Sequence, residues 1–449
     1  MIETIIFLEE AYSMKRFSSL AILVVLLAAV FILVSCGGPK QAVKLTVWMN
    51  GADSLIGPTE QQKPQEQWYI SQAFRRFEKA NPGVTIELVV QADQGAAHTN
   101  FKTAGLAGNA PDVANLWTGQ PMFALKEVIL PLDKLVPADD LKKIVGWESV
   151  RDGFKADGTI LGYPAAQNQI CHMLYNKAIV KKAGMDWEAN PPRTIAEFDA
   201  ALAKIKAIGV TPILVNEAAE GVPWFFCWVA DYWWTQMTTN EGILDETYGK
   251  KKFADDQGFL KTLAYYRTMY TNGYFRKDLT TANDSFSQFL NGKGAIWPAV
   301  TSFLADAEKG LGADCGVLLP PEFDPGSKLQ NSTVGGPGQS FVVAKNTKYP
   351  QLAVKLISFL NSKAEVLAAE KINRWPIVRN DITPEEMGWL PGSNIAKLHK
   401  YSSTYNYWVD NLLTSGPAEI FYTQTALVAV GKMTPMQLAE AMDKKAAAQ

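Results

Sequence analysis

Residues that bind transition metals are scarce in this sequence. Its 449 residues include only three histidines and four cysteines. No two cysteines have the C-x-x-C spacing of a zinc or redox site, and the histidines are scattered, at His98, His172 and His399. We therefore expect no zinc site and no cofactor. For Cys171, Cys227 and Cys315 we expect small buried side chains, with one disulfide among them left open.

A surplus of charge of one sign is also absent. The chain has 43 basic and 45 acidic residues and a net charge of −2, which gives no reason to expect nucleic acid as a partner. The Gly-x-Ser-x-Gly, His-Glu-x-x-His and phosphate-loop motifs of common enzyme classes are missing too. No carboxylates stand out as a glycosidase pair. We expect a protein that is not an enzyme, and a secreted carbohydrate hydrolase is the alternative.

One apolar run near the start of the chain is long, Leu20–Val34. It is shorter than the roughly 20 residues that a transmembrane helix needs. Lys15 and Arg16 precede it and small residues follow it, which is the order of a secretory signal. A retained membrane anchor is the alternative interpretation.

The residues after this run, LVSC (33–36), resemble the bacterial lipobox. In that signal the peptide is cut before the cysteine, which then carries acyl chains that anchor it in the membrane. We expect residues 1–35 to be a lipoprotein signal peptide, with the true start at Met14. Residues 36–43 would then form a tether that is lipidated at Cys36.

The mature chain is long enough for two domains, and its pattern alternates strands with helices. Apolar runs at 43–50, 85–90 and 111–117 predict strands, and apolar stripes at 68–77 and 101–108 predict helices between them. This order is typical of a mostly parallel sheet covered on both faces. Ligands bind beyond the carboxyl ends of such strands, which here carry Asn50, Asn115 and Trp117.

Later segments continue the α/β theme. TIAEFDAALAKIKAIG (194–209) predicts a helix, because Thr194 and Glu197 have the spacing of a capping box and Gly209 can end it. A helix is also expected over 259–270, and a strand at 341–344 followed by a helix over 349–361.

Five segments resemble the extracellular solute-binding proteins of ABC importers, in the sugar-binding branch that includes maltose-binding protein. They are FEKANPGVTIEL (77–88), GNAPDVANLW (108–117), the stretch 162–209 that begins GYPAAQNQ, FLNGKGAIWPAV (289–300) and VGGPGQSFVVAKNTKYPQLAVKLISFL (334–360). They follow the family's order over residues 44–380.

The resemblance implies a two-lobed periplasmic-binding-protein fold of type II, with discontinuous lobes joined by hinge strands. Lobe one would comprise 44–166 and 285–333, and lobe two 167–284 and 334–449. It also implies a monomer on the outer side of the cell membrane, which delivers a sugar or oligosaccharide to the importer's permease subunits.

A sugar ring has an apolar face and a rim of hydroxyl groups, so its site needs aromatic rings together with planar polar groups. The chain has 13 tryptophans, and WFFCWVADYWW (224–234) concentrates four of them. A helix over this run would place Trp224 and Trp228 on one face and Trp234 near another. Core packing is the alternative role for each of these rings.

The candidate site combines the strand-end residues with positions where the family binds its ligand. It comprises Asn50, Asn115, Trp117, Gln167, Asn168, Gln169, Trp224, Trp297, Gly335, Gly336, Arg374 and Trp375. By the resemblance, Trp224 would stack on the sugar, and the two glycines would let the backbone approach it. The many amides, Gln339 among them, favour a neutral ligand. A polyamine, a metal complex, a phosphoester or a peptide is the alternative cargo.

Overall fold

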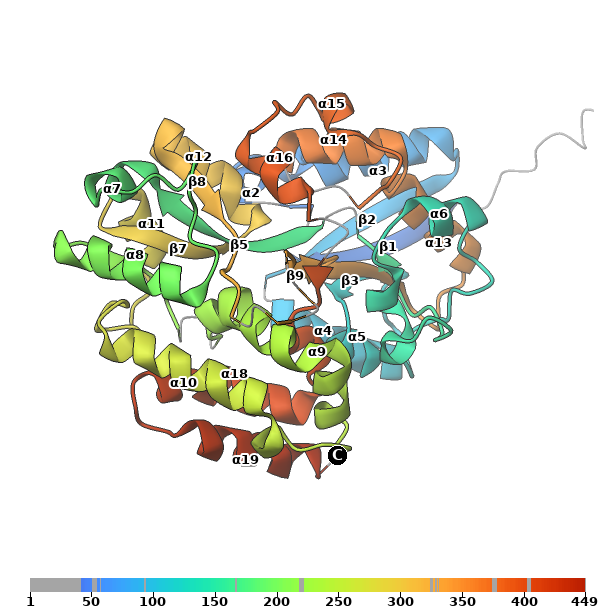
Figure 1. Ribbon diagram of the computed structural model, residues 1–449. Helices are drawn as coiled ribbons and strands as arrows, with labels where there is room; N and C mark the ends of the chain where they lie inside the picture. Colours follow the sequence, from blue (N-terminus) through green and yellow to red (C-terminus); the bar gives the residue numbers. More distant parts are fainter. Residues whose placement is uncertain are drawn as a thin grey trace, which may run out of the picture.

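Two α/β lobes make up the protein, each with its own β-sheet and its own hydrophobic core (Figure 1). The expected fold class is thus confirmed. The computed structural model describes residues 42–50, 55–56, 58–92, 94–165, 168–217, 222–323, 326–327, 329, 331–373, 378–401 and 405–448. The expected signal peptide and Cys36 lie outside the described residues.

The sheet of lobe one has the strand order β2-β1-β3-β10-β4. Its strands are β1 (Val43–Asn50), β2 (Val84–Gln91), β3 (Val113–Trp117), β4 (Tyr163–Pro164) and β10 (Gln339–Val343). β1 is parallel to β2 and β3, whereas β10 is antiparallel to β3 and β4. The three early strands are therefore confirmed, and the sheet is mixed rather than mostly parallel. Leu45, Val47 and Met49 alternate along β1 and are all buried, as the period of a strand requires.

Helices from the first part of the chain and from residues 350–387 cover this sheet. They are α2 (Pro58–Gln61), α3 (Tyr69–Ala80), α4 (Gln94–Leu106), α5 (Gln120–Phe123), α6 (Ala138–Lys143), α13 (Pro350–Leu360), α14 (Lys363–Asn373) and α15 (Pro384–Met387). In α3 the side chains of Ile70, Phe74 and Phe77 form a buried stripe. The ring centroid of Phe77 lies 5.4 Å from that of Phe359 in α13, which joins the early and late segments in one core.

The sheet of lobe two has the order β11-β9-β5-β7-β6, and β8 pairs with β5. Its strands are β5 (Gln169–Asn176), β6 (Thr211–Ile213), β7 (Gly294–Val300), β8 (Cys315–Leu318), β9 (Thr333–Gly336) and β11 (Tyr405–Asn406). All residues of β5 and β7 are buried, as in a strand covered on both faces. Cys171, Cys227 and Cys315 are buried and free, so the expectation of small buried side chains is confirmed.

The helices of lobe two include the last part of the chain. They are α7 (Lys177–Lys182), α8 (Ile195–Ala207), α9 (Asp231–Thr247), α10 (Gln257–Thr271), α11 (Ser285–Leu290), α12 (Leu304–Leu311), α16 (Asn394–His399), α17 (Val409–Leu412), α18 (Ser415–Ala429) and α19 (Pro435–Ala446). The capping box of Thr194 and Glu197 at the start of α8 is confirmed. Figure 1 shows α18 and α19 in red beside α10, so the last residues complete the helical layer of this lobe.

The expected lobe boundaries are wrong for two segments. Residues 285–333 belong to lobe two, because β7 and β8 both pair with β5. Conversely, β10 pairs with β3 and β4, so it belongs to lobe one together with α13 and α14. Each segment is an apolar strand flanked by helices, a pattern that either sheet could accept, so the sequence pattern does not decide between them.

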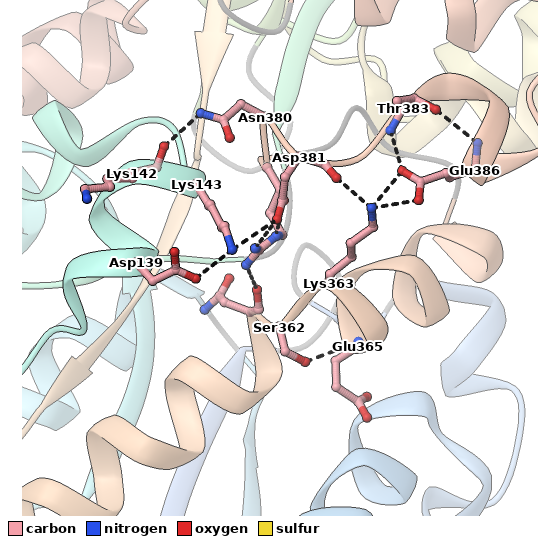
Figure 2. Close-up of polar contacts among 12 residues, drawn as sticks. Asp139, Lys142, Lys143, Ser362, Lys363, Glu365, Asn380, Asp381, Thr383 and Glu386 are labelled. Carbon is pink, nitrogen blue, oxygen red and sulfur yellow. Dashed lines mark hydrogen bonds and ion pairs between the residues drawn. The ribbon is translucent and has the colours of Figure 1, made fainter.

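Ion pairs fix the late part of lobe one where residues 378–381 pass the end of α6. Backbone hydrogen bonds join Val378 to Val145 and Asn380 to Lys143. Figure 2 shows Asp381 beside Lys143 and Lys363, and Lys363 also pairs with Glu386. The buried Arg379 makes a bidentate pair with Asp381, at 2.7 and 2.8 Å, and such pairs are stronger than exposed single contacts.

Candidate functional site

Two segments that cross between the lobes lie side by side at the centre of the molecule. The first runs from β4 to β5 and the second from β9 to β10. Gln169 faces Gly336 and Ile170 faces Gly335 in the lobe-two sheet, while Pro164 faces Ser340 in the lobe-one sheet. Residues 387–395 cross a third time. When two lobes are connected by a few crossing segments, these segments are where one lobe moves relative to the other.

Glycine is required at one position of the second crossing. A Cβ on Gly335 would lie 2.2 Å from the backbone oxygen of Gln169, which is far too close for any side chain. Gly336 has a φ of 116°, a conformation that other residues rarely adopt. Both glycines lie within β9, so the backbone that they approach closely is that of the neighbouring crossing strand.

A row of aromatic rings stands at the lobe-two side of these crossings. The rings of Trp224 and Trp228 are 4.5 Å apart and inclined by 31°, which confirms that they share one face of a helix. Trp228 contacts Trp297 at 5.9 Å, and Trp297 contacts Phe286 and Phe303 at 4.6 and 4.8 Å. Trp224 is half-buried at one end of this row, which we call the aromatic row.

The crossing strand is bonded to the aromatic row. The side-chain oxygen of Gln169 accepts hydrogen bonds from the hydroxyl of Thr301 at 2.9 Å and from the amide of Ser302 at 3.1 Å. Phe303 follows directly in the chain, and the strand that carries Trp297 ends at Val300. Gln169 therefore ties the first crossing to the end of the aromatic row.

On the lobe-one side, two neighbouring strands carry buried amides, Asn115 in the middle of β3 and Gln339 at the start of β10. Asn115 donates a weak hydrogen bond of 3.4 Å to the backbone oxygen of Ser340, and Gln339 lies opposite Trp117. Among the described residues, Oδ1 of Asn115 and both side-chain polar atoms of Gln339 have no hydrogen-bond partner. A buried amide left unpaired costs about 1–3 kcal/mol, so these groups call for a polar ligand or water.

The other predicted residues are distributed as follows. Asn50 is buried at the end of β1, and Asn168 is buried on the first crossing. Trp117 packs its ring 5.1 Å from that of His98 in α4. Gln167, Arg374 and Trp375 lie outside the described residues. Trp234 packs on Phe259 at 4.1 Å in the core, away from Trp224 as expected.

Sequence reasoning did not select Trp228, Phe286 and Phe303 for the site. Their contribution depends on contacts between α11, β7, the π-helix Phe226–Ala230 and the 3-10 turn Thr301–Phe303. For Trp228 the sequence does hold a signal, because this residue stands one helical turn after Trp224. Phe286 and Phe303 have no such signal, because the contacts that bring them to Trp297 are tertiary.

Residues 72–387, well over half of the chain, match a family described as bacterial extracellular solute-binding proteins. The protein belongs to this family. No curated protein sequence matches the chain significantly. Among the described helices of this solute-binding protein, none is both long and apolar enough to span a bilayer.

Solved structures of similar fold cover about nine-tenths of the chain. A chitin oligosaccharide binding protein is 19% identical with a TM-score of 0.76, covering 91% of this chain and 98% of that one. The GacH receptor of Streptomyces glaucescens, solved unliganded and with acarbose, is 19% identical, with coverages of 90% and 97% and a TM-score of 0.68. A sugar transporter protein of Bacillus licheniformis, in complex with stachyose, is 19% identical, with coverages of 91% and 100% and a TM-score of 0.63.

Charge is almost absent from the candidate residues of this solute-binding protein. Those that the structure describes are amides, tryptophans and glycines. His172, behind the first crossing, is fully buried, and burial lowers its pKa to about 4, so the imidazole is neutral. Glu217 accepts a hydrogen bond from the amide of Phe225, next to Trp224, and burial raises its pKa to about 7. The candidate residues that the structure describes therefore carry no charge of their own.

Proposed function

We propose that this protein is the lipid-anchored solute-binding component of an ABC importer and captures a sugar or oligosaccharide between its two lobes. It would deliver the unchanged sugar to the permease subunits. The observation that carries the proposal is that each lobe brings one kind of sugar-binding group to the crossings: lobe two the aromatic row, bonded to the first crossing through Gln169, and lobe one the buried amides of Asn115 and Gln339 on β3 and β10. Rings suit the apolar face of a sugar, and amides suit its hydroxyl groups, because each amide both donates and accepts.

The charge of the site supports a neutral ligand over the alternatives. A polyamine would require carboxylates at the site, and a phosphoester would require arginine or lysine. The described candidate residues supply neither. Proteins of the same fold are named for chitin oligosaccharide or were solved with acarbose or stachyose, which supports an oligosaccharide as the guest.

A thermal-shift panel tests the ligand class. The purified protein would be heated with chitin, xylan, malto- and galacto-oligosaccharides, and separately with polyamines, phosphate esters and peptides. A ligand at 100 times its Kd stabilises the folded state by about 2.7 kcal/mol, so one sugar class should raise the melting temperature. A shift with polyamines and with no sugar would contradict the proposal. Recovery of cleaved sugar by mass spectrometry would instead indicate a hydrolase.

Trp224 is the ring we expect to matter most for affinity. The Trp224→Ala substitution should weaken sugar binding at least tenfold, about 1.4 kcal/mol, because it removes a half-buried ring at one end of the row. Isothermal titration calorimetry measures this. Tyr270→Ala is the matched control, since Tyr270 is a half-buried aromatic of lobe two outside the row. Equal affinities for Trp224→Ala and the wild type would remove Trp224 from the site.

The lipid anchor is proposed from the sequence LVSC alone. The Cys36→Ala variant of the full chain, expressed in bacteria, should move from the membrane fraction to the soluble fraction, because no thiol is left for the acyl chain. Immunoblots of the two fractions measure this. If the variant stays with the membrane after a salt wash, a retained apolar helix would be the anchor instead.

A further inference from the structure

A short segment of lobe two touches both crossing segments and the end of β3. We call residues 406–412 the strap. Trp408 donates from its ring nitrogen to the sulfur of Cys171, at 2.8 Å, on the first crossing strand. Its ring also lies 3.3 Å from where a Cβ on Gly338 would stand, on the second crossing. The strap therefore sits where the lobes are joined.

The strap reaches lobe one through a relay of two side chains. Nδ2 of Asn411 donates to the hydroxyl of Thr118 at 2.8 Å, and that hydroxyl donates to the backbone oxygen of Pro337, also at 2.8 Å. The amide of Thr118 donates to the oxygen of Gly338 at 3.2 Å. Thr118 thus holds two consecutive carbonyl groups of the second crossing, and Asn411 fixes the orientation of its hydroxyl.

The backbones on the two sides of the relay are in close contact. Gly119 has a φ of 73°, and a Cβ there would lie 2.4 Å from the backbone oxygen of Asn411. Thr118 is fully buried and Asn411 is 7% exposed, so water does not replace a lost hydrogen bond readily. Beside them, the ring of Tyr407 packs 5.0 Å from that of Phe154 in lobe one.

We propose that Asn411 is a positioning residue, which acts through Thr118 on Pro337 and Gly338 to set the angle between the lobes. This inference rests on the proposed function for its effect on affinity. Movement of one lobe relative to the other requires the backbone of residues 337–338 to rotate, and the relay restrains both carbonyl groups there. Without the relay the lobes would sample more angles, and the fraction competent to bind would fall, which weakens the apparent affinity in proportion.

The chain offers a matched control for the decisive variant. Asn406 is also a buried asparagine of the strap, 6% exposed, and its Nδ2 donates to the hydroxyl of Ser332 at 2.9 Å. That bond lies wholly within lobe two. Asn406→Ala and Asn411→Ala therefore delete the same group with similar burial, but only the second breaks the contact between lobes.

Calorimetry and hydrogen exchange together test the inference. Asn411→Ala and Thr118→Val should each weaken sugar binding about fivefold or more, and the double variant should be no weaker than the worse single one, because both break one relay. Thr118→Ser keeps the hydroxyl and should bind within twofold of the wild type, as should Asn406→Ala. Without ligand, the amide of Thr118 should exchange at least tenfold faster in Asn411→Ala than in Asn406→Ala.

The outcomes separate the two proposals. If Asn411→Ala matches Asn406→Ala in both affinity and exchange, or if the two relay variants add in the double variant, the positioning role is overturned. If the wild type binds no sugar at all, the proposed function fails. Exchange at the Thr118 amide, which needs no ligand, then decides the positioning role by itself.

Discussion

At the scale of single residues, buried carboxyl groups give this protein a stability that depends on pH. Glu217 is fully buried, accepts from the amide of Phe225 and from the hydroxyl of Tyr266, and has its pKa raised by burial to about 7. Burial likewise raises the pKa of Asp410 to about 6. The folded state therefore keeps protons that the unfolded chain has lost, so the free energy of unfolding falls as the pH rises from about 4.5 to about 7.

Glu217→Gln should flatten this dependence. A rise in pKa from 4.5 to about 7 corresponds to about 3 kcal/mol, which the wild type loses between these pH values and the variant keeps. Urea unfolding of both proteins at intervals from pH 4.5 to 8 measures the difference. Glu246→Gln is a useful comparison, because burial raises the pKa of Glu246 to about 9, and its difference from the wild type should keep growing above pH 7. If the free energies of unfolding of Glu217→Gln and the wild type changed with pH in parallel, the raised pKa of Glu217 would be contradicted.

At the scale of elements, local signals in the sequence predict individual strands and helices. The strand at 43–50 matches β1, and the helix capped by Thr194 matches α8, because strand alternation and capping depend on neighbours in the chain. The pairing of elements is not local in this way. β7 and β10 have the same apolar character, yet they pair with different sheets.

In the candidate site, too, some features follow from local sequence and others only from the tertiary structure. The amide of Asn115 and the ring of Trp224 are recognisable in the sequence, because strand ends and family positions select them. The tight spacing at Gly335 against Gln169, and the relay from Asn411 to Thr118, join residues that are 166 or more positions apart in the chain. Only the tertiary structure brings such pairs together, so no local pattern predicts them.

At the scale of the whole molecule, each lobe has its own core. Among the described residues, the lobes are joined by three crossings, by the contacts of the strap and by a hydrogen bond from Gln120 to Tyr248, and Phe154 and Trp389 pack against both cores. This arrangement allows one lobe to rotate against the other at low cost, because neither core has to open. A ligand that contacts both lobes would then favour the state in which both sets of contacts form, by its difference in affinity between the states.

Saturating sugar should therefore make the protein more compact. Small-angle X-ray scattering with and without the sugar identified by thermal shift should show a smaller radius of gyration in the complex, since the amides of lobe one and the rings of lobe two would be drawn onto one guest. Trp224→Ala at the same sugar concentration is the control and should show a smaller change, because fewer molecules are occupied. If calorimetry shows full occupancy while scattering stays the same, the sugar binds without moving the lobes, and recognition by the importer would have to depend on the guest itself.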